Sequence, residues 1–316
     1  MIKNKVCIIG AGMVGSATMI SILNSGLVAE IVMIDQNEKK AEGEALDAFH
    51  TTSFTYMPNV LIRKGGYEDC QDAQMIVMSA GPSVKPGDNL DRRSLTKTNV
   101  EVTRAVMKEI TKYTKEAIII FVSNPVDILT YVAQNEFDYP KHKIIGSGTL
   151  LDTARMRRII GEHYLVDTKN VHGYILGEHG ATAMATWSLC NIGGIPLSKC
   201  SEKLNQPALD QDKVLKDVVE AGMKILMAKG FTNYGIAEAV ARIVKAIALN
   251  ELSILPVSTT LNGEYGIDQV AVSVPCIIGQ HGIQSIMEVP LINEEHKKLK
   301  ESAESLKHVM RDFEII

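Results

Sequence analysis

The sequence predicts an α/β protein, with a doubly wound parallel sheet in its first half and an α+β domain in its second. Short apolar runs without polar alternation recur along residues 1–148, as expected of strands buried on both faces. Helical spacing of apolar residues separates several of these runs. After residue 148 helical patterns dominate, and β-rich pieces appear only late. We therefore expect two domains, at residues 1–148 and 149–316.

Six apolar runs are the predicted strands of the first half. Each is rich in β-branched residues and lacks the polar alternation of a half-exposed strand. Ahead of the fifth run, Val102, Val106 and Ile110 recur every four residues, which indicates a helix. The predicted strands are Val6–Ile9, Ile31–Ile34, Val60–Ile62, Met75–Met78, Ile118–Val122 and Ile144–Ile145.

The second half is predicted to be mainly helical. Apolar spacing indicates helices over Leu151–Gly161, Gln211–Lys229 and Ile236–Leu249, whereas Gln269–Val274 has the composition of a strand. A last amphipathic helix is expected from Asn293, with acidic residues in its first turn.

The composition excludes several classes of protein. Apolar residues make up 46% and charged residues 22% of the 316, which is typical of a globular chain and not of a disordered or fibrous one. Lysine plus arginine number 33 and aspartate plus glutamate 37, a net charge of -4. With this balance and no polybasic cluster, we expect no nucleic-acid or membrane partner. Small molecules or further copies of the chain are the expected partners.

The cysteines and the first residues favour a reducing compartment. The apolar run at residues 6–9 is too short for a signal or membrane-spanning segment, so we expect a cytoplasmic protein. The five cysteines lack the paired spacing of a zinc site or redox motif, and no metal site is expected. They are Cys7, Cys70, Cys190, Cys200 and Cys276.

The most informative motif is a glycine-rich turn at residues 10–15, GAGMVG, which follows the first predicted strand and opens a helix. Gly10 permits the tight turn, Gly12 lets the backbone approach a pyrophosphate, and Gly15 allows close packing of helix on strand. Free N–H groups in the first helical turn attract the phosphates. In this context the motif predicts a dinucleotide site in a Rossmann fold.

Asp35 indicates which dinucleotide is bound. It ends the second predicted strand, twenty residues after Gly15, where an acid can hydrogen-bond a ribose diol. Its carboxylate would repel the 2′-phosphate of NADP, and the next two residues, Gln36 and Asn37, supply no arginine to bind that phosphate. The alternative is a turn residue that merely ends a strand. Together with the glycines, Asp35 favours NAD.

Three further segments hold residues with chemical potential. Asp152 and Arg155 share one face of a predicted helix, where a surface ion pair is the simpler interpretation. His179 lies between glycines in GEHG, although a lone histidine is more often structural. Arg92 and Arg93 lie in a loop, residues 80–99, rich in glycine and proline.

These segments resemble the L-lactate and malate dehydrogenase superfamily, and the resemblance covers nearly the whole chain. It is carried, in the family's order, by the strings GAGMVG, GEALD, SNPVD, GSGTLLDTARMR, VHGYILGEHG and KGFTNYGIA, which look like the L-lactate dehydrogenase branch. The resemblance implies NAD-dependent oxidation of an L-2-hydroxy acid by a homotetramer or homodimer.

The resemblance also assigns the catalytic roles. His179 is expected to donate and accept the proton, Asp152 to hold its ring, Arg155 to bind the substrate carboxylate, and Arg92 to polarise the ketone. Hydride transfer to a 2-oxo acid leaves charge on oxygen, so a group titrating near neutral pH must supply a proton. An arginine fork can hold a carboxylate with two parallel hydrogen bonds, which lysine cannot do.

Further site residues follow from the resemblance alone. Asn124 is expected to contact both substrate and cofactor, and a cis bond before Pro125 is compatible with its motif. Thr232 is expected near the substrate and Ile236 near the nicotinamide. For most of these positions simple packing is the alternative. The remaining residues of the cofactor groove would be Val14, Lys40, Tyr67, Gly81, Val122 and Ser147.

The chain departs from the family pattern around the substrate. Val84 stands where lactate dehydrogenases usually carry glutamine and malate dehydrogenases arginine, and valine cannot pair with a second carboxylate. Oxaloacetate is therefore disfavoured. Gly235 and Ala181 replace larger residues, which suggests a roomier pocket. We expect L-lactate as the substrate, with a broader L-2-hydroxyisocaproate-type specificity as the alternative. The loop is about two residues longer than usual, so Arg93 rivals Arg92.

Arg157 and His172 match a pair found in bacterial lactate dehydrogenases that fructose 1,6-bisphosphate activates. Two residues along a helix turn about 200°, so Arg157 would face away from the side that carries Arg155. Two such basic pairs meeting at a symmetry axis would attract a bisphosphate. A solvated arginine and a surface histidine are the alternative.

Two other classes of protein remain to be weighed. An NAD-dependent glycosidase would need a cluster of metal-ligating cysteine and histidine, which the spacing does not provide. A non-catalytic NAD-binding protein would have no reason to keep Asp152, Arg155 and His179 together. An absorbance assay of NADH with pyruvate would separate that class from an enzyme.

Overall fold

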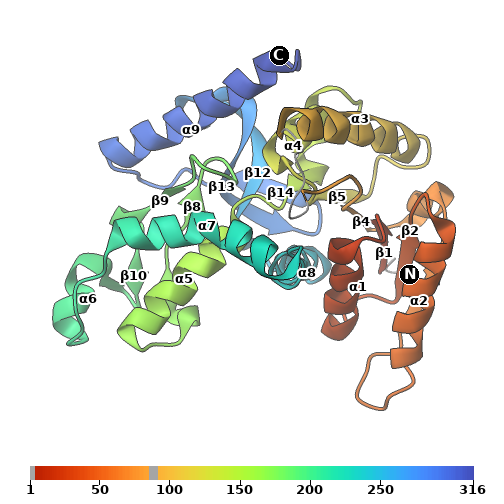
Figure 1. The fold of residues 1–316 in the computed structure, drawn as a ribbon, viewed down its shortest axis with the longest axis horizontal. Coiled ribbons are helices and arrows are strands. Elements are labelled where there is room, and N and C mark those ends of the chain that lie inside the picture. Colours follow the sequence, from red (N-terminus) through yellow and green to blue (C-terminus); the bar gives the residue numbers. More distant parts are fainter. Residues whose placement is uncertain (1–3, 85–91) are drawn as a thin grey trace.

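The computed structural model describes residues 4–84 and 92–316, with the backbone alone for residues 92–94. In this described part, nine strands form one sheet in the order β3-β2-β1-β4-β5-β6-β12-β13-β14 (Figure 1). The first six strands pair in parallel, in the order typical of dinucleotide-binding folds. They are β1 (Lys5–Ile9), β2 (Glu30–Ile34), β3 (Leu61–Lys64), β4 (Met75–Met78), β5 (Ile118–Phe121) and β6 (Ile144–Gly146).

The six predicted strands are all present, and the predicted α/β class is confirmed. Every residue of β1, β4 and β5 is buried, as the lack of polar alternation implied. The third strand begins one residue later than predicted, at Leu61. The helices between the strands are α1 (Met13–Ser25), α2 (Glu38–Thr51), α3 (Arg92–Ile110) and α4 (Val126–Asn135).

The remaining strands of the sheet come from the second half of the chain. They are β12 (Ser253–Asn262), β13 (Asp268–Gly279) and β14 (Gly282–Ile286), and they pair in antiparallel fashion. β12 also pairs with β6 through Ser258 and Gly146, so the sheet continues from one half of the chain into the other. The prediction placed only residues 269–274 in a strand and missed β12. These strands are much longer than their local patterns suggested.

Gln134 strengthens the junction between β6 and β12. Its side-chain amide, on α4, donates to the carbonyl of Ile144 (2.8 Å) and to Thr259 Oγ1 (3.0 Å). Its oxygen accepts the backbone N–H of Thr260 at 2.7 Å. Because Gln134 is almost fully buried, these bonds replace water for a polar group that would otherwise be costly to bury.

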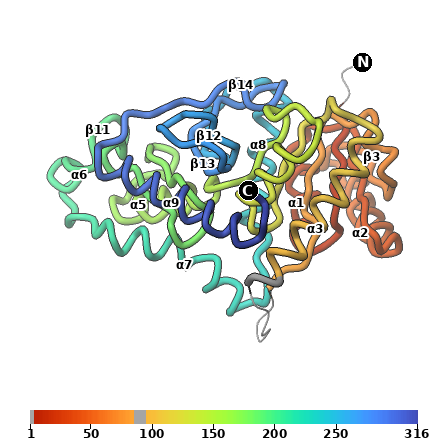
Figure 2. Tube along the Cα trace, turned by 90° about the horizontal axis from the view of Figure 1, so that it is seen from above, coloured from red at the N-terminus to blue at the C-terminus, as the bar shows by residue number. Residues whose placement is uncertain are grey.

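Helices make up much of the second half, and one of them packs against the first half. They are α5 (Leu150–Tyr164), α6 (Leu197–Lys203), α7 (Gln211–Lys229), α8 (Tyr234–Ala248) and α9 (Asn293–Asp312). α8 packs on α1, with a hydrogen bond from Ser21 Oγ to Glu238 Oε1 (2.9 Å). Viewed from above, α6 and β3 lie at opposite ends, with β12 and β13 between them (Figure 2). α7 has the predicted bounds.

Two small antiparallel sheets complete the second half. One joins β7 (Val171–His172), β10 (Asn191–Ile192) and β11 (Ile195–Pro196). The other joins β8 (Ile175–Leu176) and β9 (Met184–Ala185), and the segment between these two strands carries His179. No helix in the described ranges is long and apolar enough to cross a bilayer.

Candidate active site

The glycine-rich turn lies where β1 meets α1. Its three glycines differ in what a β-carbon at each position would meet. A β-carbon on Gly15 would lie 1.8 Å from the carbonyl oxygen of Gly10, so only glycine fits there. Gly10 has φ +107°, and a β-carbon on it would press on the backbone of Ala80. A β-carbon on Gly12 would meet no protein atom within 4 Å. The chain therefore leaves open space beside Gly12, where a pyrophosphate is expected to approach the backbone.

Asp35 holds the turn in place. Its Oδ2 accepts the backbone N–H of Ala11 at 2.7 Å, and its Oδ1 accepts that of Asn37 at 2.8 Å. The carboxylate thus lies at the carboxyl ends of β1 and β2, beside the glycine turn. This position, together with the space beside Gly12, fits an adenine dinucleotide with a free ribose diol.

The other predicted cofactor residues gather at the same edge of the sheet. Gly81, Val122 and Ser147 follow the carboxyl ends of β4, β5 and β6, three neighbouring strands. Val14 and Lys40 lie on α1 and α2. Tyr67 begins the short helix η1 (Tyr67–Asp72) after β3, and Asn124 follows β5.

Sequence reasoning missed two polar residues that order this edge. Ser79, just after β4, donates to the carbonyls of Ile9 or Gly10, each at 3.1 Å. Asn99, on α3, donates to the carbonyl of Asn124 at 2.6 Å and to that of Pro82 at 3.1 Å. Both contacts join segments distant in sequence, so no local pattern signals them.

Asp152 joins the other two predicted catalytic groups. Its Oδ2 lies 2.6 Å from His179 Nδ1, and its Oδ1 accepts a hydrogen bond from Arg155 Nη1 at 2.9 Å. Asp152 is only 5% exposed, so the simpler interpretation, a surface ion pair, does not hold. One turn of α5 supplies Asp152 and Arg155, and the loop after β8 supplies His179.

The charges of Asp152, His179 and Arg155 shift the pKa values of His179 and Asp152. Burial opposes the charged form of His179, but the charge of Asp152 and its hydrogen bond outweigh burial and raise the pKa of the imidazole above its ordinary 6.5. Burial likewise disfavours the Asp152 anion, yet His179 and Arg155 hold the pKa of Asp152 below 3.8. Asp152 therefore stays ionised and favours a protonated His179 at neutral pH.

The backbone that carries His179 is held from three sides. The N–H of Gly177 donates to the carbonyl of Ser273 on β13 (3.0 Å), and the N–H of Glu178 donates to Ser302 Oγ on α9 (2.8 Å). The N–H of His179 donates to Asp127 Oδ2 on α4, at 2.8 Å. Asp127 follows Asn124 and the cis peptide bond before Pro125, so this contact joins the predicted cofactor edge of the sheet to the loop that carries His179.

The predicted substrate residues are placed in part. Thr232 precedes α8 and Ile236 lies in its first turn. The space beside Gly235 is filled by Leu151, whose Cδ1 would lie 3.0 Å from a β-carbon at position 235. Leu151 therefore occupies the space beside Gly235, and the roomier substrate pocket stays a prediction.

The loop residues are described only to Val84. Val84 is half-buried, and Ala181 is exposed on the loop that carries His179. Arg92 begins α3, but the side chains of Arg92 and Arg93 lie outside the described residues. Their rivalry for the catalytic role remains a prediction.

The predicted effector residues lie close together, Arg157 on α5 and His172 at the end of β7. Arg157 Nη2 and Nε donate to the carbonyl of Gly173, at 3.0 and 3.2 Å, one residue after His172. The guanidinium also lies 5.7 Å from the centre of the Tyr174 ring. Burial lowers the pKa of Arg157, and no described carboxylate forms an ion pair with it. His172 itself is exposed.

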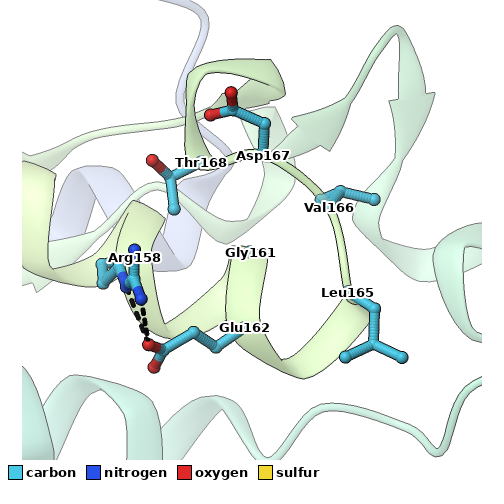
Figure 3. A pocket seen from close by; sticks show the side chains of 7 residues that line it. All are labelled: Arg158, Gly161, Glu162, Leu165, Val166, Asp167 and Thr168. Carbon is cyan, nitrogen blue, oxygen red and sulfur yellow. Dashed lines mark hydrogen bonds and ion pairs between the residues drawn. The ribbon is translucent and has the colours of Figure 1, made fainter.

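A separate pocket lies at the end of α5 and contains none of the predicted site residues. This open pocket has a volume of about 560 Å³ and is lined in part by the Arg158–Glu162 ion pair (Figure 3). Across the described ranges, no group of three or more His, Cys, Asp or Glu side chains could hold a metal ion.

Comparison with known proteins shows that the chain is similar to dehydrogenases. Residues 4–146 match the model of the lactate/malate dehydrogenase NAD-binding domain, and residues 149–314 match that of its alpha/beta C-terminal domain. The chain is 58% identical to L-lactate dehydrogenase 2 of Clostridium acetobutylicum, over 98% of this chain and 97% of that protein. It is 43% identical to an L-lactate dehydrogenase of Selenomonas ruminantium, over 98% and 97% of the two chains.

Two solved structures have the same fold. The minor L-lactate dehydrogenase of Enterococcus mundtii superposes with a TM-score of 0.92 at 39% identity, over 98% of each chain. A lactate dehydrogenase from a deep-sea metagenome library superposes with a TM-score of 0.94 at 37% identity, over 99% of each.

Proposed function

The chain belongs to the lactate/malate dehydrogenase family, and from that premise we propose that it is an L-lactate dehydrogenase. The proposed reaction is reversible: pyruvate, NADH and a proton give L-lactate and NAD. The observation that carries the proposal is the bridge that Asp152 forms between His179 and Arg155. This bridge supports the proposal because it brings together an imidazole that would donate the proton and a guanidinium that would bind the substrate carboxylate.

The residues of this group would divide the chemistry between them. The glycine turn and Asp35 would hold the dinucleotide, which would supply the hydride as NADH and accept it as NAD. His179 would give its Nε2 proton to the carbonyl oxygen of pyruvate while Asp152 holds Nδ1. Arg155 uses one nitrogen on Asp152 and keeps other donors for the substrate carboxylate. Arg92 or Arg93 would add charge beside the carbonyl.

The substrate panel should include pyruvate, 2-oxobutyrate, 2-oxoisocaproate, phenylpyruvate and oxaloacetate, each assayed for kcat/KM with NADH. We expect pyruvate to be best and oxaloacetate to be poor, because Val84 supplies no charge for a second carboxylate. A best value for oxaloacetate would contradict this assignment. Equal values for 2-oxoisocaproate and pyruvate would favour the broader L-2-hydroxy acid specificity. No turnover of any substrate would favour a non-catalytic NAD-binding protein.

We further propose that fructose 1,6-bisphosphate binds at Arg157 and His172. Arg157 is half-buried without a carboxylate partner among the described residues, so a phosphate would supply its missing counterion. The bisphosphate should raise kcat/KM for pyruvate in the wild type and not in Arg157→Gln. Arg158→Gln, one residue along α5 and exposed, is the matched control and should respond as the wild type does.

Assembly and location complete the proposal. We propose a homotetramer or homodimer, consistent with exposed Leu46 and Phe49 on α2, and light scattering during gel filtration would measure its mass. Five free cysteines, all buried, are consistent with a cytoplasmic setting. We also propose the division into a cofactor domain, residues 1–148, and a catalytic domain, residues 149–316.

A further inference from the structure

Asp127 contacts the backbone of His179 while Asp152 contacts its ring. The two carboxylates come from different helices, α4 and α5, and each forms a short hydrogen bond to the same residue, at 2.8 and 2.6 Å. Asp127 is 2% exposed, so its contact is shielded from water. We propose that Asp127 is a positioning residue that fixes the backbone of His179 and adds a second negative charge in favour of the protonated imidazole.

The neighbouring contacts show why the charge of Asp127 calls for an explanation. The N–H groups of Gly177 and Glu178 are held by neutral acceptors, a carbonyl and a hydroxyl. A neutral acceptor could also accept the His179 N–H, in a weaker bond but at a much lower cost of desolvation. A buried carboxylate is costly unless its charge is compensated, and a nearby cation is one means of doing so.

Among the described residues, His179 is the one group acting on Asp127 that can become a cation. No described lysine or arginine forms an ion pair with Asp127, and its Oδ1 makes no regular hydrogen bond, although the Ser258 hydroxyl lies beside it. Burial raises the pKa of Asp127 to about 6, against the opposing effects of Ser258, the His179 N–H and the His179 charge. Protonation of His179 therefore stabilises the Asp127 anion, and the anion stabilises the imidazolium.

The other charges around the pair are identified. Asp152 acts on His179 in the same direction as Asp127, and Arg155 acts against both. Glu178 disfavours ionisation of Asp127. Asp152 has the larger influence on His179, so loss of the Asp127 charge should shift the titration of His179 and not abolish it.

Substitution by asparagine separates charge from geometry. In Asp127→Asn the side-chain oxygen can still accept the His179 N–H, while the charge is lost. We expect the pH at which pyruvate reduction declines to move down by about half to one unit, a loss of about 3- to 10-fold in kcat/KM above that pH and little change below it. Asp127→Glu keeps the charge and should keep the wild-type position of this decline, even where kcat falls.

Ser302→Ala is the matched control, because it removes the neutral contact of the adjacent residue. It should lower kcat by a similar factor at every pH, without moving the decline. NADH binding, followed by NADH fluorescence, should be unchanged in all three variants and reports that each is folded. An Asp127→Asn profile that superimposes on the wild type, or is lowered evenly at all pH values, would overturn the proposal.

The proposal rests on the proposed dehydrogenase activity, and a second readout separates the two. NMR of protein with 13C-labelled histidine rings follows the titration of His179 directly, with the resonance assigned by its loss in His179→Asn. A lower midpoint in Asp127→Asn supports the charge role even if pyruvate is not the substrate. An unchanged midpoint overturns it, whatever the activity.

Discussion

Leu151 fills the space that the missing β-carbon of Gly235 leaves open, with its Cδ1 3.0 Å from where that carbon would be. The contact joins the first turns of α5 and α8, one residue before each of Asp152 and Ile236. Leu151, and not Gly235, therefore sets the room at this part of the predicted substrate wall.

Leu151→Ala should shift specificity toward longer 2-oxo acids. Removing the Cγ methine and the two Cδ methyl groups opens space for an aliphatic chain, and one methyl or methylene group of a substrate changes discrimination by about 1–3 kcal/mol. We expect the ratio of kcat/KM for 2-oxoisocaproate over pyruvate to rise at least about tenfold. Gly235→Ala should do the reverse by pressing on Leu151. An unchanged ratio in Leu151→Ala would place the side-chain pocket elsewhere.

Asp152→Asn should shift the pH dependence of both directions of the reaction. The pKa of His179 is raised in the folded protein, so wild-type pyruvate reduction, which needs the imidazolium, persists above pH 6.5 and declines through the raised pKa. L-lactate oxidation, which needs neutral imidazole, increases over the same range. Without Asp152 burial dominates and the pKa falls.

The expected loss in Asp152→Asn at pH 7 is on the order of 100-fold in pyruvate reduction, measured from pH profiles of kcat/KM. Glu162→Gln, which removes an exposed ion pair with Arg158 on the same helix, is the control and should keep the wild-type profile. If the Asp152→Asn profiles for pyruvate reduction and L-lactate oxidation were both identical to those of the wild type, Asp152 would have no part in the protonation of His179.

Arg155→Lys should weaken substrate binding far more than cofactor binding. Lysine keeps the charge but loses the planar fork that can bind a carboxylate with two bonds while contacting Asp152. We expect kcat/KM for pyruvate to fall by about 100-fold or more, with the Kd of NADH nearly unchanged. Arg158→Lys tests the same exchange at an exposed position of α5, where no effect is expected. Equal losses of kcat/KM in Arg155→Lys and Arg158→Lys would point to damage of the helix.

Substitutions at Gly12 and Gly15 distinguish an effect on cofactor binding from an effect on stability. A β-carbon on Gly12 meets no protein atom, so Gly12→Ala should keep the wild-type Tm and weaken NADH binding at least about tenfold, by crowding the pyrophosphate. A β-carbon on Gly15 meets the Gly10 carbonyl at 1.8 Å, so Gly15→Ala should lower Tm as well. Normal NADH affinity in Gly12→Ala would show that the pyrophosphate does not bind against this turn.

Local patterns were sufficient for the cofactor half of the fold. The strands there are short, continuous and apolar, and the glycine turn follows directly on the first of them, so neighbours in sequence are neighbours in the structure. The shared face of Asp152 and Arg155 was predictable for the same reason, since both lie on one turn of α5.

Contacts between distant segments could not be predicted in this way. Asp127 belongs to the SNPVD string, but nothing local shows that it meets the backbone of a residue 52 positions later. The hairpin of β12 and β13 is stabilised by pairing along its whole length and by its junction with β6, so its local composition understates it. Leu151 offered no signal at all, because its importance comes from the glycine opposite.

Gln134 also has a mechanical consequence. Since it joins the last parallel strand to the first antiparallel one, the two halves cannot swing apart without breaking buried bonds on both sides of the seam. Any movement that admits substrate or releases product must then come from surface segments, over a rigid frame. Backbone amides of β12 at this seam should be among the slowest in the molecule to exchange with deuterium, at rates set by global unfolding.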